Sequence, residues 1–171
     1  MVESFRPGFP IDESGVSIPT TEQPKYKDLI NLPGNHRKLI AERIAKLDIP
    51  LSESELKFFE FPNRHNGSDA VYLLEQFVDE DWLLASHLEP KRNTSRHKHI
   101  APMGTEQYYW LAGEAILNID GEDVPLDSEH DFRVVPLDAV HQLRTEGAFV
   151  LTLIVMKNAR LVTPENRHIR V

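Results

Sequence analysis

Short apolar runs separated by turn residues fill the sequence from Leu56 to about residue 156, and this pattern constrains the fold more than any other feature. Turn pairs such as Asn66-Gly67 and Asp120-Gly121 stand between the runs. Many short strands with frequent turns are typical of an all-β sandwich or barrel, and no second helical pattern is present to build a parallel α/β sheet. The runs predict strands over residues 56–61, 70–78, 82–88, 107–112, 115–119, 132–135 and 149–156.

The first 55 residues follow a different pattern. Residues 1–34 contain five prolines, which oppose both helices and regular strand pairing, so we expect an extended arm. Behind Asn35, apolar residues recur at helical spacing and predict one amphipathic helix over about 35–47. We therefore expect an N-terminal extension over 1–55, a β-barrel domain over 56–157 and a polar C-terminal tail over 158–171.

Composition argues against several classes of function. The chain has no cysteine, which removes disulfide and thiol chemistry and fits a reducing compartment, so we expect a cytoplasmic protein. Its formal net charge of −8 opposes binding to nucleic acid or to anionic lipid, and no run of about 18 apolar residues predicts a membrane segment or signal peptide. One basic stretch either rims a site for a small anion or is a solvated loop; it comprises Lys91, Arg92, Arg96 and Lys98.

Three histidines and a glutamate form the group most indicative of chemistry. His97 and His99 are two residues apart, so in an extended strand both imidazoles project from one face. Glu106 follows, and His141 begins another predicted strand from which a third imidazole would complete the set. Such nitrogen and oxygen donors suit a divalent transition metal, and Fe, Mn, Ni and Zn all remain open.

The first half of this group resembles the opening motif of the cupin superfamily. That motif reads as glycine, five residues, H-x-H, three or four residues, glutamate, six residues and glycine. Here Lys91 stands at the first glycine, six residues separate His99 from Glu106, and the family's six residues separate Glu106 from Gly113. The longer loop leaves two alternatives, in which Glu106 is either a ligand or is replaced by water beside three histidines.

The second half is similar to the other cupin motif, which contains P-x-G-x-x-H. Pro136, Asp138 and His141 occupy its positions, and Thr145 stands where the family often has asparagine. Asp138 replaces a glycine, but aspartate tolerates left-handed backbone better than most residues, so the turn can form. The resemblance covers about residues 83–156.

This resemblance implies a fold, a ligand set and an assembly. The fold would be a double-stranded β-helix, a jelly-roll barrel preceded by the extended arm and one short α-helix. A divalent metal ion would bind His97, His99, Glu106 and His141. Cupins are often homodimers formed through an edge strand or an exchanged N-terminal arm, so a homodimer is expected.

Three functions are compatible with such a centre. The first hypothesis is a dioxygenase-type enzyme that acts on a small polar, oxygen-bearing substrate. The alternatives are a sugar or sugar-phosphate isomerase or epimerase, and a non-catalytic module that binds or senses a small ligand. DNA binding is not expected, because one helix cannot form a helix-turn-helix.

Residues that share the ligand face are candidates for substrate contact. Strand alternation places Tyr108 and Trp110 on the face of Glu106; Tyr108 is predicted to act with Glu106 in catalysis, and Trp110 to be core. His87, on the strand that enters the motif, either faces the cavity or is structural. An apolar wall of the cavity is predicted from Leu117, Ile119, Leu143, Leu151, Leu153 and Val155.

Overall fold

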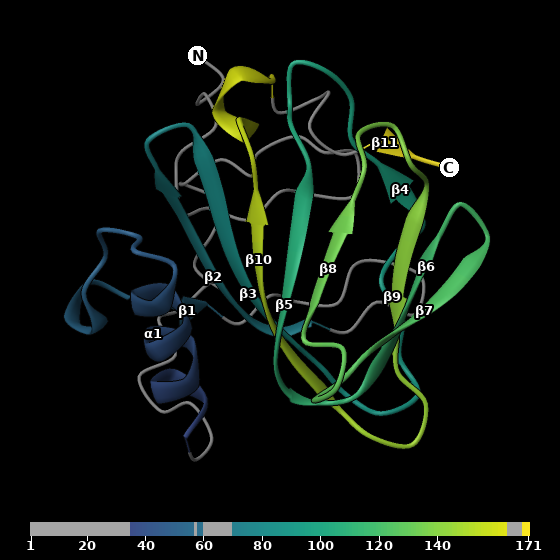
Figure 1. Cartoon of the computed structure of the whole chain (residues 1–171), viewed down its shortest axis with the longest axis horizontal. Coiled ribbons are helices and arrows are strands. Elements are labelled where there is room, and N and C mark those ends of the chain that lie inside the picture. Colours follow the sequence, from purple (N-terminus) through teal and green to yellow (C-terminus); the bar gives the residue numbers. More distant parts are fainter. Residues whose placement is uncertain (1–34, 57, 60–69, 164–168) are drawn as a thin grey trace.

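The computed structural model describes residues 35–56, 58–59, 70–163 and 169–171, and these form two antiparallel sheets with one helix (Figure 1). The predicted extended arm lies outside the described residues. One sheet has six strands in the order β1-β2-β3-β10-β5-β8, with bounds Phe58–Phe59, Ala70–Val78, Asp81–Leu88, Val150–Met156, Glu106–Gly113 and Phe132–Val135. The other has five in the order β11-β4-β9-β6-β7, with bounds Ile169–Arg170, His97–Lys98, His141–Arg144, Ala115–Ile119 and Glu122–Leu126.

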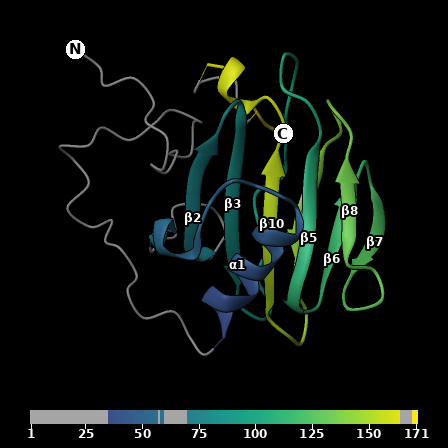
Figure 2. The ribbon, with the colours of Figure 1, turned by 60° about the vertical axis from the view of Figure 1, so that its left-hand side comes forward.

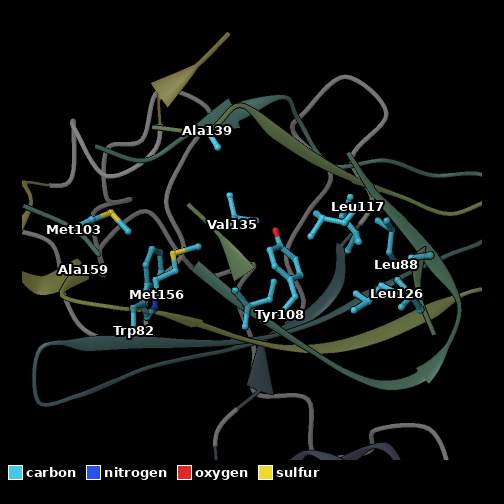
Figure 3. Packing of buried hydrophobic residues seen from close by; sticks show 14 of the residues in the cluster. Trp82, Leu88, Met103, Tyr108, Leu117, Leu126, Val135, Ala139, Met156 and Ala159 are labelled. Carbon is cyan, nitrogen blue, oxygen red and sulfur yellow. The ribbon is translucent and has the colours of Figure 1, made fainter. Parts of the chain in front are cut away.

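The principal core lies between the two sheets, and both contribute side chains to it (Figure 3). Trp82, Tyr108 and Met156 enter it from the six-stranded sheet, and Leu117 and Leu143 from the five-stranded sheet. The predicted positions of Leu117 and Leu143 are thus confirmed. Burying each of these large side chains contributes roughly 1.5–3 kcal/mol, so the facing sheets hold one another in place.

A second core lies on the outer face of the six-stranded sheet, where helix α1 (His36–Lys46) lies across β3, β10 and β5 (Figure 2). Ile40 and Ile44 of α1 are completely buried against Leu151, Leu153 and other residues of the sheet. The helix prediction is confirmed. A helix this short is only marginally stable alone in water, so the packing of its apolar stripe on the sheet stabilises it.

This second core corrects the predicted cavity wall. Leu151, Leu153 and Val155 face α1, whereas Ile154 and Met156 face the space between the sheets. Every residue of β10 is buried, so the strand has no polar face from which its orientation could be deduced.

β7 and β11 are among the described strands that were not predicted from the sequence. β7 is an edge strand that contains Pro125, a residue that weakens a strand pattern and is tolerated mainly at edges. β11 pairs with β4, the strand that contains His97. No helix of the described chain has the length and apolar character needed to cross a bilayer.

Candidate metal centre

The four predicted ligands come from both sheets and converge between them. His97 in β4 is the direct cross-strand partner of His141 in β9, and directly opposed residues project from the same face of a sheet. Glu106 opens β5 in the facing sheet, where its register partners Val135 and Met156 belong to the core between the sheets. His99 lies one residue beyond the end of β4.

The donor atoms of these side chains are close together and shielded from water. One nitrogen or oxygen atom from each of His97, His99, Glu106 and His141 lies within 4.8 Å of the other three. Glu106 Oε2 is 3.0 Å from His99 Nε2 and 2.5 Å from His141 Nε2, and the four residues are at most 5% exposed. This buried group could hold a metal ion.

Backbone carbonyls fix the orientation of two of the imidazoles. His97 Nδ1 lies 2.9 Å from the Ser95 carbonyl oxygen, and His141 Nδ1 lies 3.1 Å from that of Ala139. A carbonyl only accepts, so each Nδ1 carries the proton and each Nε2 retains its lone pair for a metal. Metal-binding histidines usually show this second hydrogen bond, so the residues fit a metal centre.

The charges in the cluster support the same conclusion. Burial alone would raise the pKa of Glu106, but the neighbouring imidazoles of His141 and His99 lower it well below the usual range. Burial opposes protonation of His141, yet the negative charge of Glu106 and the hydrogen bonds to Glu106 and Ala139 raise its pKa. The pair is therefore an anion beside an imidazole that binds a proton or another cation readily.

The longer loop before Glu106 does not displace the carboxylate. Gly104 N donates to the Lys157 carbonyl oxygen at 2.7 Å, and Asp138 N donates to that of His99 at 2.8 Å, which ties the loop to both neighbouring segments. Of the two alternatives left open by the sequence, the structure favours the one in which Glu106 reaches the cluster.

The two residues that stand at glycine positions of the cupin motifs both have left-handed backbone. Asp138 has a φ of 67° and Lys91 a φ of 60°, both in the left-handed region. Lys98 Nζ lies 2.8 Å from Asp138 Oδ1, so one cation of the basic stretch is paired across the turn. The remaining three, Lys91, Arg92 and Arg96, are exposed, which favours the solvated-loop interpretation.

Tyr108 lies beside the candidate ligands. It is 2% exposed, its ring centroid is 6.4 Å from that of His141, and its hydroxyl points into the core between the sheets (Figure 3). Burial, the negative charge of Glu106 and the hydrogen bond that its hydroxyl donates to Glu106 raise the pKa of Tyr108 well above its ordinary value. Tyr108 is therefore a neutral hydrogen-bond donor at neutral pH.

The structure also shows where Trp110 and His87 lie. Trp110 packs against the core between the sheets and its indole N–H donates to the Gly113 carbonyl oxygen at 2.7 Å, in agreement with a core residue. His87 faces α1, with ring centroids 5.5 Å from His36 and 5.2 Å from Phe149, so it does not face the cavity. Neighbouring Ser86 has the inward position instead, because its register partner Thr152 lies two residues before Ile154, which is on the inner face of β10.

One inward residue was missed by sequence reasoning. Arg133 is the direct cross-strand partner of Tyr108, which places its side chain on the inner face beside that phenol. Alternation in the segment Phe132–Val135 is the signal that could have found it, because buried Val135 and Arg133 share a face.

Comparisons with known proteins support the fold. Neither a family profile nor a curated protein matches the chain. Among solved structures, a cupin-2 domain from Rhodospirillum rubrum matches with a TM-score of 0.51 and 12% identity over 60% of this chain and 69% of that one. A cupin 2 conserved barrel protein from Rhodopseudomonas palustris gives 0.50 and 12% over 60% and 71%. The chain has a cupin fold.

The cupin fold confirms the predicted jelly-roll architecture, in which two antiparallel sheets face each other. A structure described for DMSP lyases also matches, with a TM-score of 0.43 and 19% identity over 63% of this chain. That match spans 49% of the lyase chain. At these identities the likeness concerns the fold, and cupin barrels host many reactions, so the function must be argued from the site.

Proposed function

We propose that this protein is a metal-dependent cupin enzyme of the dioxygenase type that acts on a small polar, oxygen-bearing substrate. The observation that supports it is the buried convergence of His97, His99, Glu106 and His141 from two facing sheets. A six-coordinate ion held by these four residues would have two positions left, enough for a bidentate oxygen substrate or for a substrate and dioxygen. A bound Fe, Mn or Ni ion supplies Lewis acidity and one-electron chemistry, whereas Zn supplies Lewis acidity alone.

The protein's own residues supply orientation, a dry environment and a proton donor. The Ser95 and Ala139 carbonyl oxygens hold two imidazoles with Nε2 toward the cluster. The apolar core excludes water around Glu106 and strengthens its interaction with cations. Tyr108 keeps its proton because of burial and the charge of Glu106. Its single O–H donates to Glu106 in this structure, so it would turn from Glu106 to donate to a substrate oxyanion.

Isomerisation is the weaker alternative, because the residues of described burial include no second buried carboxylate. Moving a proton along a sugar requires a base in addition to the metal ligands. Among residues whose burial the structure describes, Glu106 is the only buried carboxylate, and it belongs to the ligand cluster. The dioxygenase proposal needs no such additional base.

Oxygen uptake separates an enzyme from a sensor. Protein loaded anaerobically with Fe(II) should consume dioxygen with at least one member of a panel of diketones, thiols and catechols. His97→Ala should lose this turnover, and the matched His130→Ala variant, at an exposed histidine paired with Asp127, should keep it. Melting shifts with these compounds but no uptake by any of them would contradict the enzyme and favour a ligand-binding module.

Two further predictions concern the whole chain. A homodimer formed through the N-terminal residues predicts that light scattering gives twice the monomer mass for the full chain and a lower mass for a chain that lacks residues 1–34. An unchanged mass would contradict a role of these residues in assembly. The cytoplasmic location also stays a prediction.

A further inference from the structure

Arg133 lies on the inner face of β8, in the row next to that of Glu106. Its strand, β8, alternates between exposed Phe132 and Val134 and inward-facing Arg133 and Val135. Val135 pairs with Glu106 and Arg133 pairs with Tyr108, so these two rows are adjacent on the inner face. Residues two apart on a strand are roughly 7 Å apart, so the row of Arg133 and Tyr108 lies about this distance from the row of Val135 and Glu106.

One nitrogen of the Arg133 guanidinium makes a hydrogen bond that fixes the side chain. Arg133 Nε donates to the Pro125 carbonyl oxygen at 2.8 Å, and Pro125 belongs to β7 of the facing sheet. The contact therefore holds the side chain across the gap between the edge strands β8 and β7. Within the described part of the chain, the terminal nitrogens of Arg133 make no hydrogen bond or ion pair, although the residue is partly buried.

We propose that Arg133 binds a carboxylate group of the substrate, so that the substrate is a small acid with a second oxygen directed toward the His97, His99, Glu106 and His141 cluster. This inference deepens the proposed function and rests on it. The terminal N–H groups of an arginine match both oxygens of a carboxylate in a planar, bidentate arrangement. The tie to Pro125 fixes the side chain in advance, so less conformational entropy is lost when the acid binds.

The spacing restricts the acid to a short one. A carboxylate on Arg133 and a hydroxyl or carbonyl oxygen at the cluster must bridge adjacent rows of the sheet, roughly 7 Å apart before the reach of the side chains is subtracted. A 2-hydroxy or 2-oxo acid of a few carbons suits this arrangement, because its carboxylate and second oxygen stand on adjacent carbons and the side chains cover the rest of the distance. In this arrangement Tyr108, in the same row as Arg133, lies beside the bound acid.

Binding of an acid and its uncharged amide tests the inference without turnover. Lactate and lactamide have nearly the same shape, and the redox-inert Zn(II)-loaded protein binds either without oxidation. The chain has two tryptophans, Trp82 and Trp110, and both pack on the core between the sheets, so intrinsic fluorescence reports on this space, with calorimetry as a second readout. The wild type should prefer lactate to lactamide by at least about 10-fold, the size of effect expected for a charge-assisted hydrogen bond.

The variants assign this preference to Arg133. Arg133→Gln should reduce it about 10-fold and Arg133→Lys should restore part of it. Arg144→Gln, which removes a half-buried arginine paired with Asp123 on the outer face of the five-stranded sheet, should leave it unchanged. An Arg133→Gln preference equal to that of the wild type would overturn the inference, as would inorganic phosphate bound more tightly than lactate. If Arg133→Gln does not fold, a wild-type preference below 10-fold overturns it.

Titration of the metal-free protein separates failure of this inference from failure of the proposed function. If elemental analysis finds no metal in the purified wild type, the proposed metal enzyme is contradicted. A preference for lactate over lactamide that depends on Arg133 and persists in EDTA would still support this inference. A metal-loaded protein whose preference ignores Arg133 would contradict the inference and leave the metal centre intact.

Discussion

Loss of a single imidazole from the cluster should abolish the stabilisation of this protein by divalent ions. The donor atoms belong to β4, β5, β9 and the residue after β4, and only the folded chain brings them within 4.8 Å of one another. An ion that binds only the folded state, at a free concentration of 100 times its Kd, stabilises it by about 2.7 kcal/mol. In a chain of 171 residues each kcal/mol moves Tm by roughly 2–4 °C, so the expected shift is roughly 5–11 °C.

The assay is thermal unfolding of EDTA-treated protein with and without added Zn(II) or Mn(II), alongside elemental analysis of protein purified without added metal. The wild type and His130→Ala should show the shift and near-stoichiometric metal. His97→Ala should show neither, because its imidazole is one of the four donors. Equal metal content and equal shifts in His97→Ala and the wild type would refute the assignment of this cluster as the metal centre.

Three further outcomes follow from the structure. Burial opposes protonation of His141, but the charge of Glu106 raises its pKa, so protonated His141 stabilises the folded state. This contribution to the free energy of unfolding is complete below the ordinary histidine pKa near 6.5 and is lost as pH rises through the raised pKa. In EDTA, Tm should therefore fall between these two pH values, and less steeply in Glu106→Gln. Gly113→Ala should cost about 3 kcal/mol in urea unfolding, because its φ is +80° and a Cβ would lie 1.9 Å from a backbone oxygen, whereas Gly147→Ala, with open space, should cost less than about 0.5 kcal/mol. Thr152→Val should raise the free energy of unfolding by about 1 kcal/mol, because this hydroxyl is fully buried and has no partner among the described residues. A flat pH profile, equal costs at the two glycines, or a destabilised valine variant would contradict these respective predictions.

The sequence by itself determined the class of fold and the members of the candidate centre. Strand alternation and turn residues are local signals, so the strands from Ala70 to Val78 and from Ala115 to Ile119 have the predicted bounds. The i, i+2 spacing of His97 and His99 is also local, and the order of Glu106 and His141 behind it carried the resemblance to the cupin motifs. These features needed no knowledge of which strands pair.

Only the tertiary structure decided which face of each doubly buried strand turns inward. Leu153 and His87 lie on strands covered by the core on one face and by α1 on the other, so hydrophobic alternation could not orient them. The pairing of β4 with β9, which brings His97 opposite His141, joins segments more than 40 residues apart and depends on how the sheets assemble. The same holds for Arg133, whose place beside Tyr108 follows from the register of β8 on β5. Register is set by contacts between strands distant in sequence, and a local pattern does not contain that information.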